Sequence, residues 1–149
     1  TLINVALGHF KTTVMQNKIS IQANLGNVQY RTALSNGKHT LLADEPESEG
    51  GLAAGPTPDE LLAMALAACT SITLRMYSQR KKWDLGEIAV AVDMQRQEDG
   101  SAVFERKITF EKKPDAATCE RLMIVADKCP VHKTLSHVNT IISSLQTAL

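Results

Sequence analysis

Apolar and polar residues alternate along residues 18–42, which is the period of a strand with one buried face. The apolar positions are Ile19, Ile21, Ala23 and Leu25 in one series, and Val28, Tyr30, Thr32 and Leu34 in the next. Gly26-Asn27 separates the two series. Asn36-Gly37 predicts a type I′ hairpin turn, because that turn requires positive φ at both central residues. We therefore expect antiparallel strands that return over Lys38 to Leu42. Residues 1–17 are ambiguous, with a further strand as one interpretation.

A long helix is predicted from Pro58 to about Lys81. Thr57 is a suitable N-cap, proline is favoured at the first helical position, and Glu60 completes a capping box. The segment Leu61 to Ala68 is apolar on every side, so we expect this part of the helix to be buried all round. The acids, glycines and prolines of residues 43–57 predict a polar, irregular loop before it.

The second half of the chain predicts a hairpin followed by helices. Ile88, Val90, Val92 and Met94 alternate as a strand, Glu98-Asp99-Gly100 forms a turn, and Val103 to Phe110 returns. A helix capped by Asp115 follows Pro114, and Pro130 opens a short third helix through Leu135. The β-branched segment Val138 to Leu145 predicts a final strand. Strands, long helix, strands and helices indicate an α+β fold, and residues 1–149 form one domain without a linker.

The composition argues against nucleic-acid binding and membrane binding. Lys plus Arg equals Asp plus Glu, 16 each, so no net charge draws the chain to nucleic acid or to anionic lipid. Aromatic residues make up only 4%, too few for a base-stacking platform. We find no apolar run near the ~18 residues of a membrane span and no signal peptide. We therefore expect no nucleic-acid or membrane partner and a cytoplasmic location.

The three cysteines are the main candidates for chemistry. There is no CxxC pair, no HExxH motif and no glycine-rich phosphate loop. Cys69 lies in the middle of the long helix, where a small core residue is the simplest interpretation and burial raises a thiol pKa. A reactive Cys69 requires a cation from elsewhere, such as Arg31 if the first sheet packs on this helix. Cys129 precedes Pro130 at a helix start, where the dipole stabilises a thiolate, although a structural turn explains it equally well. Cys119 is interpreted as a bystander.

Several segments resemble the OsmC/Ohr family. They are Asp44-Glu45-Pro46, Gly50-Gly51, the run from Gly55 to Leu62, and Ala67-Ala68-Cys69-Thr70. Thr73 to Tyr77 and Arg80 to Trp83 are similar to its OsmC-like redox branch, and Asp127 to His132 resembles its second cysteine motif. The similarity runs from about residue 18 to the C-terminus. Two ordered cysteine motifs, 60 positions apart, make it specific.

The resemblance implies an OsmC-like fold with antiparallel sheets packed on a long central buried helix. It implies an intertwined homodimer with two sites at the interface. Independently, the helix segment Leu61 to Ala68, apolar all round, predicts an obligate homodimer with an interface of more than ~2,000 Å² in total. The resemblance also implies a thiol peroxidase that reduces organic hydroperoxides in oxidative stress defence. Cys69 then attacks the peroxide, Cys129 resolves the sulfenic acid as a disulfide, and an external dithiol, lipoyl in some members, restores both thiols. No metal or organic cofactor is implied.

Two family positions differ here. Family peroxidases place a glutamate ten residues before the attacking cysteine, where this chain has Asp59, and Glu60 is one position off. Local signals already explain both acids, Glu60 by the capping box and Asp59 by the helix dipole. The family's activating arginine lies in the first strand region, where Arg31 is the nearest candidate and is displaced by several residues. Asp59, Glu60 and Arg31 are therefore supporting candidates only.

Three function classes follow. The first is the hydroperoxide reductase, and the second is a non-catalytic module that binds an apolar ligand in the interfacial pocket. A structural zinc site formed by Cys69, Cys129 and His132 is the third. The local dipole favours Cys129 as the thiol of lower pKa, whereas the family assigns attack to Cys69. We follow the family on roles, because a dipole contribution of ~0.3–1 kcal/mol can be overridden by tertiary neighbours.

Overall fold

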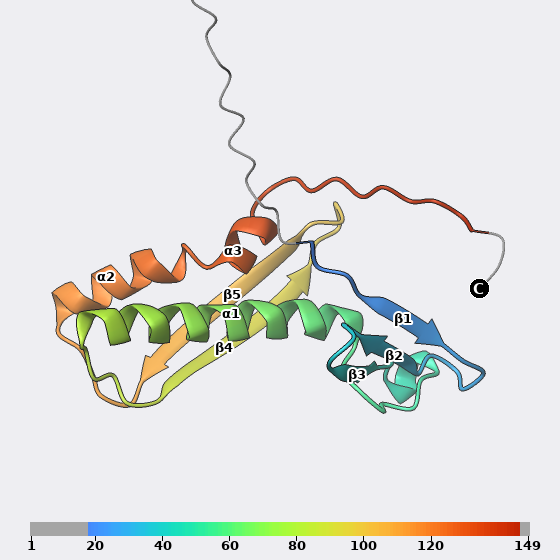
Figure 1. Ribbon diagram of the computed structural model, residues 1–149, viewed down its shortest axis with the longest axis horizontal. Coiled ribbons are helices and arrows are strands. Elements are labelled where there is room, and N and C mark those ends of the chain that lie inside the picture. Colours follow the sequence, from blue (N-terminus) through green and yellow to red (C-terminus); the bar gives the residue numbers. More distant parts are fainter. Residues whose placement is uncertain (1–17, 147–149) are drawn as a thin grey trace, which may run out of the picture.

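The computed structural model describes residues 18–146, so the interpretation of residues 1–17 lies outside the described part. The elements are β1 (Gln22–Leu25), β2 (Thr32–Ser35), β3 (Thr40–Ala43), a 3-10 turn η1 (Glu47–Glu49), α1 (Pro58–Lys81), β4 (Ile88–Arg96), β5 (Ala102–Phe110), α2 (Ala116–Ala126) and α3 (Pro130–Leu135). The antiparallel hairpin β4–β5 runs along α1, α2 and α3 lie along the same helix, and the sheet β1-β2-β3 lies at its N-terminal end (Figure 1). The predicted α+β class is confirmed.

The first sheet contains both predicted hairpins, with two corrections. The expected strand over Val28 and Tyr30 is wrong: the Arg31 backbone N–H donates to the Val28 carbonyl at 3.1 Å, and β2 starts only at Thr32. At the second turn Gly37 has φ +88°, but Asn36 has no positive φ, so the turn is not type I′. The Asn36 side-chain oxygen instead accepts two backbone N–H groups from the following residues and stabilises a longer connection.

The loop before α1 is organised around one buried acid. The Asp44 carboxylate accepts backbone N–H groups of Glu45, Leu52 and Ala54 at 2.8, 3.2 and 3.1 Å. Burial opposes ionisation, but these donors and the charge of Arg31 together keep the pKa of Asp44 below its ordinary value. The sequence motif that starts at Asp44 therefore stabilises the fold of this loop.

Glycine is required where this loop crosses its own backbone. A Cβ on Gly51 would lie 1.9 Å from the Glu45 carbonyl oxygen, and one on Gly55 would lie 2.2 Å from the Leu42 carbonyl oxygen. Neither backbone atom can move away cheaply. The glycines of the motif therefore let residues 51–55 pack against the end of β3 and position the start of α1.

The long helix begins and ends as predicted, and its capping box is confirmed. The Thr57 hydroxyl accepts the Glu60 N–H at 3.2 Å, and the Glu60 carboxylate accepts the Thr57 N–H at 2.8 Å. Burial all round is wrong for the single chain, because β4, α2 and α3 cover only one side. The buried stripe repeats every four residues, at Leu66, Thr70, Leu74 and Ser78. On the opposite side Met64, Ile72 and Met76 are 53%, 59% and 59% exposed.

The core lies where the second half of α1 meets α2 and the hairpin. Its buried members are Leu74, Leu85, Leu122, Val125 and Ala126. Tyr77, Trp83, Ile88, Ile108 and Phe110 pack around them. This cluster fixes α2 against α1, and so it fixes the turn that follows α2.

The C-terminal segment does not form the predicted strand. Residues 137–146 have no helix or strand, and Val138, Ile141, Ile142 and Leu145 are almost fully exposed. A strand requires a neighbour to accept and donate its backbone hydrogen bonds. Within residues 18–146 no strand lies beside this segment, so its β-branched composition has nothing to pair with.

By length and composition α1 is apolar enough to cross a membrane, so the expectation that no segment approaches such a span is wrong. The same composition suits a core helix. The buried stripe packs on the hairpin and on α2, and it includes the hydroxyl groups of Thr70 and Ser78.

Candidate functional site

The fold brings together two cysteines that stand 60 positions apart in the sequence. Cys69 lies in the middle of α1, at the border between its buried stripe and its exposed apolar side. Cys129 lies in the turn between α2 and α3. The two thiols lie close enough for each to shift the pKa of the other. They differ in access, since Cys69 is half-buried whereas Cys129 is 0% exposed.

The turn between α2 and α3 sets the place of Cys129. The Cys129 backbone N–H donates to the Ala126 carbonyl at 3.2 Å, which closes the end of α2. Pro130 then starts α3, with Cys129 as its N-cap residue. The N–H groups of Val131 and His132 are thereby turned toward the sulfur of Cys129. Local sequence signals, a proline after the cysteine and the end of a helix before it, therefore produce this arrangement.

The surroundings shift the two thiols in opposite directions. Burial raises the pKa of Cys69, and its neighbour Cys129 raises it further. Burial also opposes ionisation of Cys129, but hydrogen bonds from Cys69, from two backbone N–H groups and from the Thr70 hydroxyl lower its pKa. Of the two thiols, Cys129 has the lowered pKa and is therefore the better thiolate. This agrees with the helix-terminus argument made from the sequence.

The three supporting candidates have other partners in the chain. Arg96 binds Asp59 through two nitrogens, the Nε contact being 2.7 Å, and holds the pKa of that carboxyl below its ordinary value. Glu60 serves in the capping box. The charge of Arg31 acts on Asp44. Among the contacts of residues 18–146, none joins Arg31, Asp59 or Glu60 to either thiol.

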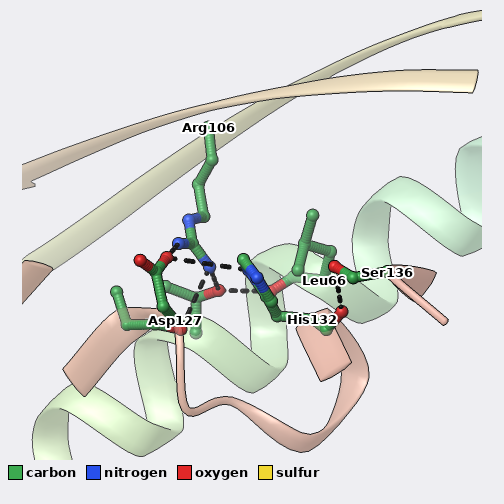
Figure 2. A network of polar contacts seen from close by, with 7 residues as sticks. Leu66, Arg106, Asp127, His132 and Ser136 are labelled. Atoms are coloured by element: carbon green, nitrogen blue, oxygen red, sulfur yellow. Dashed lines mark hydrogen bonds and ion pairs between the residues drawn. The ribbon is translucent and has the colours of Figure 1, made fainter. Parts of the chain in front are cut away.

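Arg106 is a site residue that sequence reasoning missed. Its side chain extends from β5 into the space between α1 and the α2–α3 turn (Figure 2), where it is 9% exposed. The guanidinium donates to the Thr70 hydroxyl oxygen at 3.0 Å, to the Ala126 carbonyl at 3.2 Å and to the Asp127 carboxylate at 2.8 Å. The sequence does carry a signal for it: Arg106 alternates with Phe104 and Ile108 on the inward face of β5, where a charged residue is unusual.

A hollow of about 300 Å³ lies beside Arg106, between β5, α1 and α3. Leu66, Phe104 and Leu135 form its apolar walls, and His132 lines its polar side. The His132 ring nitrogen Nδ1 lies 3.7 Å from the Asp127 carboxylate (Figure 2). The hollow therefore combines apolar walls with a charged floor.

Two further sequence hypotheses are tested by position. Cys119 lies on α2, where its sulfur contacts the Pro114 carbonyl at 3.7 Å, and it is not part of the thiol pair. Across the described residues 18–146, no three His, Cys, Asp or Glu side chains are gathered to hold a metal ion. This includes the set of Cys69, Cys129 and His132.

Fold and site together define an α+β protein with a pair of interacting thiols. The chain belongs to the OsmC-like protein family, whose family model matches residues 49–144. Solved structures share the fold, although each is under 25% identical. A putative osmotic stress induced and detoxification response protein from Psychrobacter arcticus has TM-score 0.69 and 21% identity, over 81% of this chain and 90% of that one.

Two further structures support the same fold. An OsmC-like protein from Mycoplasma pneumoniae has TM-score 0.67 and 22% identity, over 83% of this chain and 91% of that one. An organic hydroperoxide resistance protein OsmC from Legionella pneumophila has TM-score 0.62 and 19% identity, over 81% and 90%. No protein of curated function matches the chain.

Proposed function

We propose that the chain is a thiol-dependent hydroperoxide reductase in which Cys69 attacks the peroxide and Cys129 resolves the product. The observation that carries the proposal is the pair of neighbouring thiols with unequal access. Cys69 is half-buried and can meet a small molecule, whereas the neighbouring Cys129 is fully buried. The Legionella relative, named an organic hydroperoxide resistance protein, shares this fold and supports the substrate class.

The proposed reaction balances without a cofactor. The Cys69 sulfur attacks the terminal peroxide oxygen, the O–O bond breaks, and the alkoxide leaves and is protonated to an alcohol. Cys69 is then a sulfenic acid, which the Cys129 thiolate attacks, forming an S–S bond and releasing hydroxide. The peroxide gains two electrons and the thiol pair loses two. An external dithiol reduces the disulfide by exchange, which suits a reducing compartment such as the cytoplasm.

The thiol pair also accounts for the proton of Cys69. Because Cys129 lies beside Cys69 and has the lowered pKa of the pair, its sulfur is a suitable acceptor for that proton. We propose that the proton moves to Cys129 as Cys69 attacks, and passes from there to the alkoxide. Cys129 is then a thiolate again when the sulfenic acid has formed. This route does not depend on the arginine expected near the first strands.

An organic hydroperoxide fits the surface beside Cys69 better than a fully polar peroxide. Leu62, Ile72 and Met76 are exposed on α1 within two turns of Cys69. Contact with an alkyl or aryl group removes this apolar surface from water, at about 25 cal/mol per Å². Hydrogen peroxide offers no apolar surface for such a contact.

Stopped-flow kinetics test this function. The reduced protein should consume cumene hydroperoxide faster than a free thiol and faster than it consumes hydrogen peroxide. Cys69→Ser should abolish the reaction, and Cys129→Ser should leave a sulfenic acid on Cys69 that overoxidises. Cys119→Ser is the matched control and should react as the parent protein does. Peptide mapping should find a Cys69–Cys129 disulfide within one chain. A rate equal to that of free thiol would refute the proposal.

A second candidate function is supported by the hollow beside Arg106. Its volume of about 300 Å³ and its apolar walls match the lower end of ligand pockets. A non-catalytic module would bind an apolar ligand there without thiol oxidation. Calorimetric binding of cumyl alcohol, a stable analogue, together with unreactive thiols would favour this function over the reductase.

We propose a homodimer as the working assembly. The exposed side of α1 around Met64, away from the residues proposed to contact substrate, leaves apolar surface in contact with water. A second copy placed on it would enclose the Cys69 border and form two equivalent sites, with more than ~2,000 Å² buried in total. Sedimentation equilibrium should find a dimer at micromolar concentration. A stable folded monomer would refute this assembly.

A further inference from the structure

We infer that Arg106 is a positioning residue for the thiol pair: its guanidinium joins α1 to the α2–α3 turn and thereby holds Cys129 against Cys69. The inference rests on the proposed function, because it assigns Arg106 a part in the disulfide step. The contacts of Arg106 that support the inference all lie within one chain. They do not depend on which oxidant reacts with the thiols.

The contacts of Arg106 flank both cysteines. On α1 it binds the hydroxyl of Thr70, the residue that follows Cys69. On the turn it binds the Ala126 carbonyl and the Asp127 carboxylate, three and two residues before Cys129. The Ala126 carbonyl also accepts the Cys129 backbone N–H at 3.2 Å. One guanidinium therefore fixes the distance between the two backbone segments that carry the sulfurs.

The Thr70 hydroxyl links the guanidinium to the Cys129 sulfur. Its oxygen accepts from Arg106, so its hydrogen is left to donate, to the Leu66 carbonyl at 2.8 Å or to Cys129. A positive group on the oxygen polarises the O–H and strengthens the bond that it donates. When the Thr70 hydroxyl donates to Cys129, the charge of Arg106 stabilises a thiolate there without touching the sulfur.

Neither an apolar residue nor lysine reproduces this arrangement. Phe104 and Ile108 occupy the neighbouring inward positions of β5, so the row is otherwise apolar. Placing a charge in that row costs desolvation energy, which three acceptors offset here. Lysine retains the charge, but its single ammonium lacks the planar fork that reaches separate acceptors at once.

The test measures the thiol pair without a peroxide. The full chain, as Cys119→Ser, is oxidised with diamide, an azo compound that takes two electrons from neighbouring thiols. Disulfide formation is followed by mass spectrometry after quenching, and the thiolate by ultraviolet absorbance against pH. The variants are Arg106→Gln and Arg106→Lys. Lys107→Gln is the matched control, because Lys107 is adjacent on β5 and its side chain is 72% exposed.

Arg106→Gln should slow disulfide formation about ten- to a hundredfold, since small displacements of reacting groups cost that much. Its thiolate titration should move to higher pH. Arg106→Lys should remain slow but keep part of the low titration midpoint, which separates charge from geometry. Lys107→Gln should match the parent in both measurements. An Arg106→Gln variant with the control's rate and midpoint would overturn the inference.

A variant with a smaller structural change keeps the test decisive if Arg106→Gln does not fold. Thr70→Val preserves the side-chain shape and removes only the hydroxyl. We expect it to raise the titration midpoint and to slow the disulfide step, and an unchanged midpoint and rate would overturn the inference. A protein that does not reduce hydroperoxides still reports on Arg106, because diamide oxidises any two adjacent thiols. Failure of the proposed function is therefore distinguishable from failure of this inference.

Discussion

The hairpin β4–β5 carries two arginines that pair with helix-associated aspartates, and the pairs differ in their surroundings. Arg96 binds Asp59 at the start of α1, and these side chains are 61% and 42% exposed. Arg106 binds Asp127 after α2, but its own side chain is almost buried and has two further acceptors. The Arg96–Asp59 pair joins β4 to the start of α1 in contact with water. Arg106 instead joins β5 to α1 and to the α2–α3 turn inside the molecule.

The difference in burial decides how much each ion pair contributes to the structure of the site. Exposed pairs gain little free energy, because water and salt screen the charges and the side chains lose conformational freedom. A buried guanidinium leaves polar groups without partners when it is removed, and that loss is larger. The exposed pair lies at the position where the family resemblance places an activating acid, yet the buried arginine is the one beside the thiols.

The largest expected effect is the loss of Arg106. Arg106→Met should lower the free energy of unfolding by about 1–3 kcal/mol, because the Thr70 hydroxyl and the Ala126 carbonyl lose a donor. Urea unfolding at matched protein concentration measures this change. Arg96→Gln is the control and should change the midpoint far less. Equal shifts for the two variants would show that burial does not distinguish the pairs.

Asp127→Asn should have an intermediate effect. It removes only the ion pair at 2.8 Å and leaves the bonds from Arg106 to Thr70 and Ala126 in place. Because the Asp127 side chain is 60% exposed, we expect a loss of at most about 1 kcal/mol. The diamide-driven disulfide step should remain within a few fold of the parent. A loss of unfolding free energy as large as that of Arg106→Met would show that the Asp127 carboxylate, and not the bonds to Thr70 and Ala126, contributes most of the stability.

The smallest effect is expected at Asp59, and it depends on pH. The Arg96 hydrogen bonds and charge lower the pKa of Asp59. A carboxyl with a lowered folded pKa adds stability above its unfolded pKa of about 3.9 and loses it as the pH falls through the folded value. Asp59→Asn should therefore be slightly less stable than the parent at pH 7, with no difference at the lowest pH. Thermal unfolding across pH checks this, and a gap that widens in acid would contradict it.

Where folding signals are local, the sequence predicted the structure well. The Thr57 capping box sets the start of α1, and Asp115 caps α2 through the Thr118 N–H at 2.7 Å. Pro130 opens α3 as expected. Each signal acts within about one helical turn, so no tertiary information is needed. The place of Cys129 at the start of α3 followed from the same kind of evidence.

Features that depend on distant partners were harder to predict. The strand expected over Val138 to Leu145 has no neighbour in the described chain, and β propensity alone does not supply one. The partner of Asp59 was missed because Arg96 is 37 residues away and only the hairpin brings it near. Arg106 was not predicted, because the segment Val103 to Phe110 was recognised only as the returning strand of the hairpin. A charged residue between the inward positions of Phe104 and Ile108 is itself a signal.

The complete burial of Cys129 gives the proposed catalytic cycle a direction. In the oxidised protein an incoming reductant meets the sulfur of Cys69 first, since Cys129 has no exposed surface. A mixed disulfide then forms on Cys69 and Cys129 departs. The hydrogen bonds that lower the pKa of Cys129 make it the better leaving group, and low-pKa thiols leave faster. The burial that prevents Cys129 from meeting a peroxide thus also directs the reductant to the sulfur of Cys69 during regeneration.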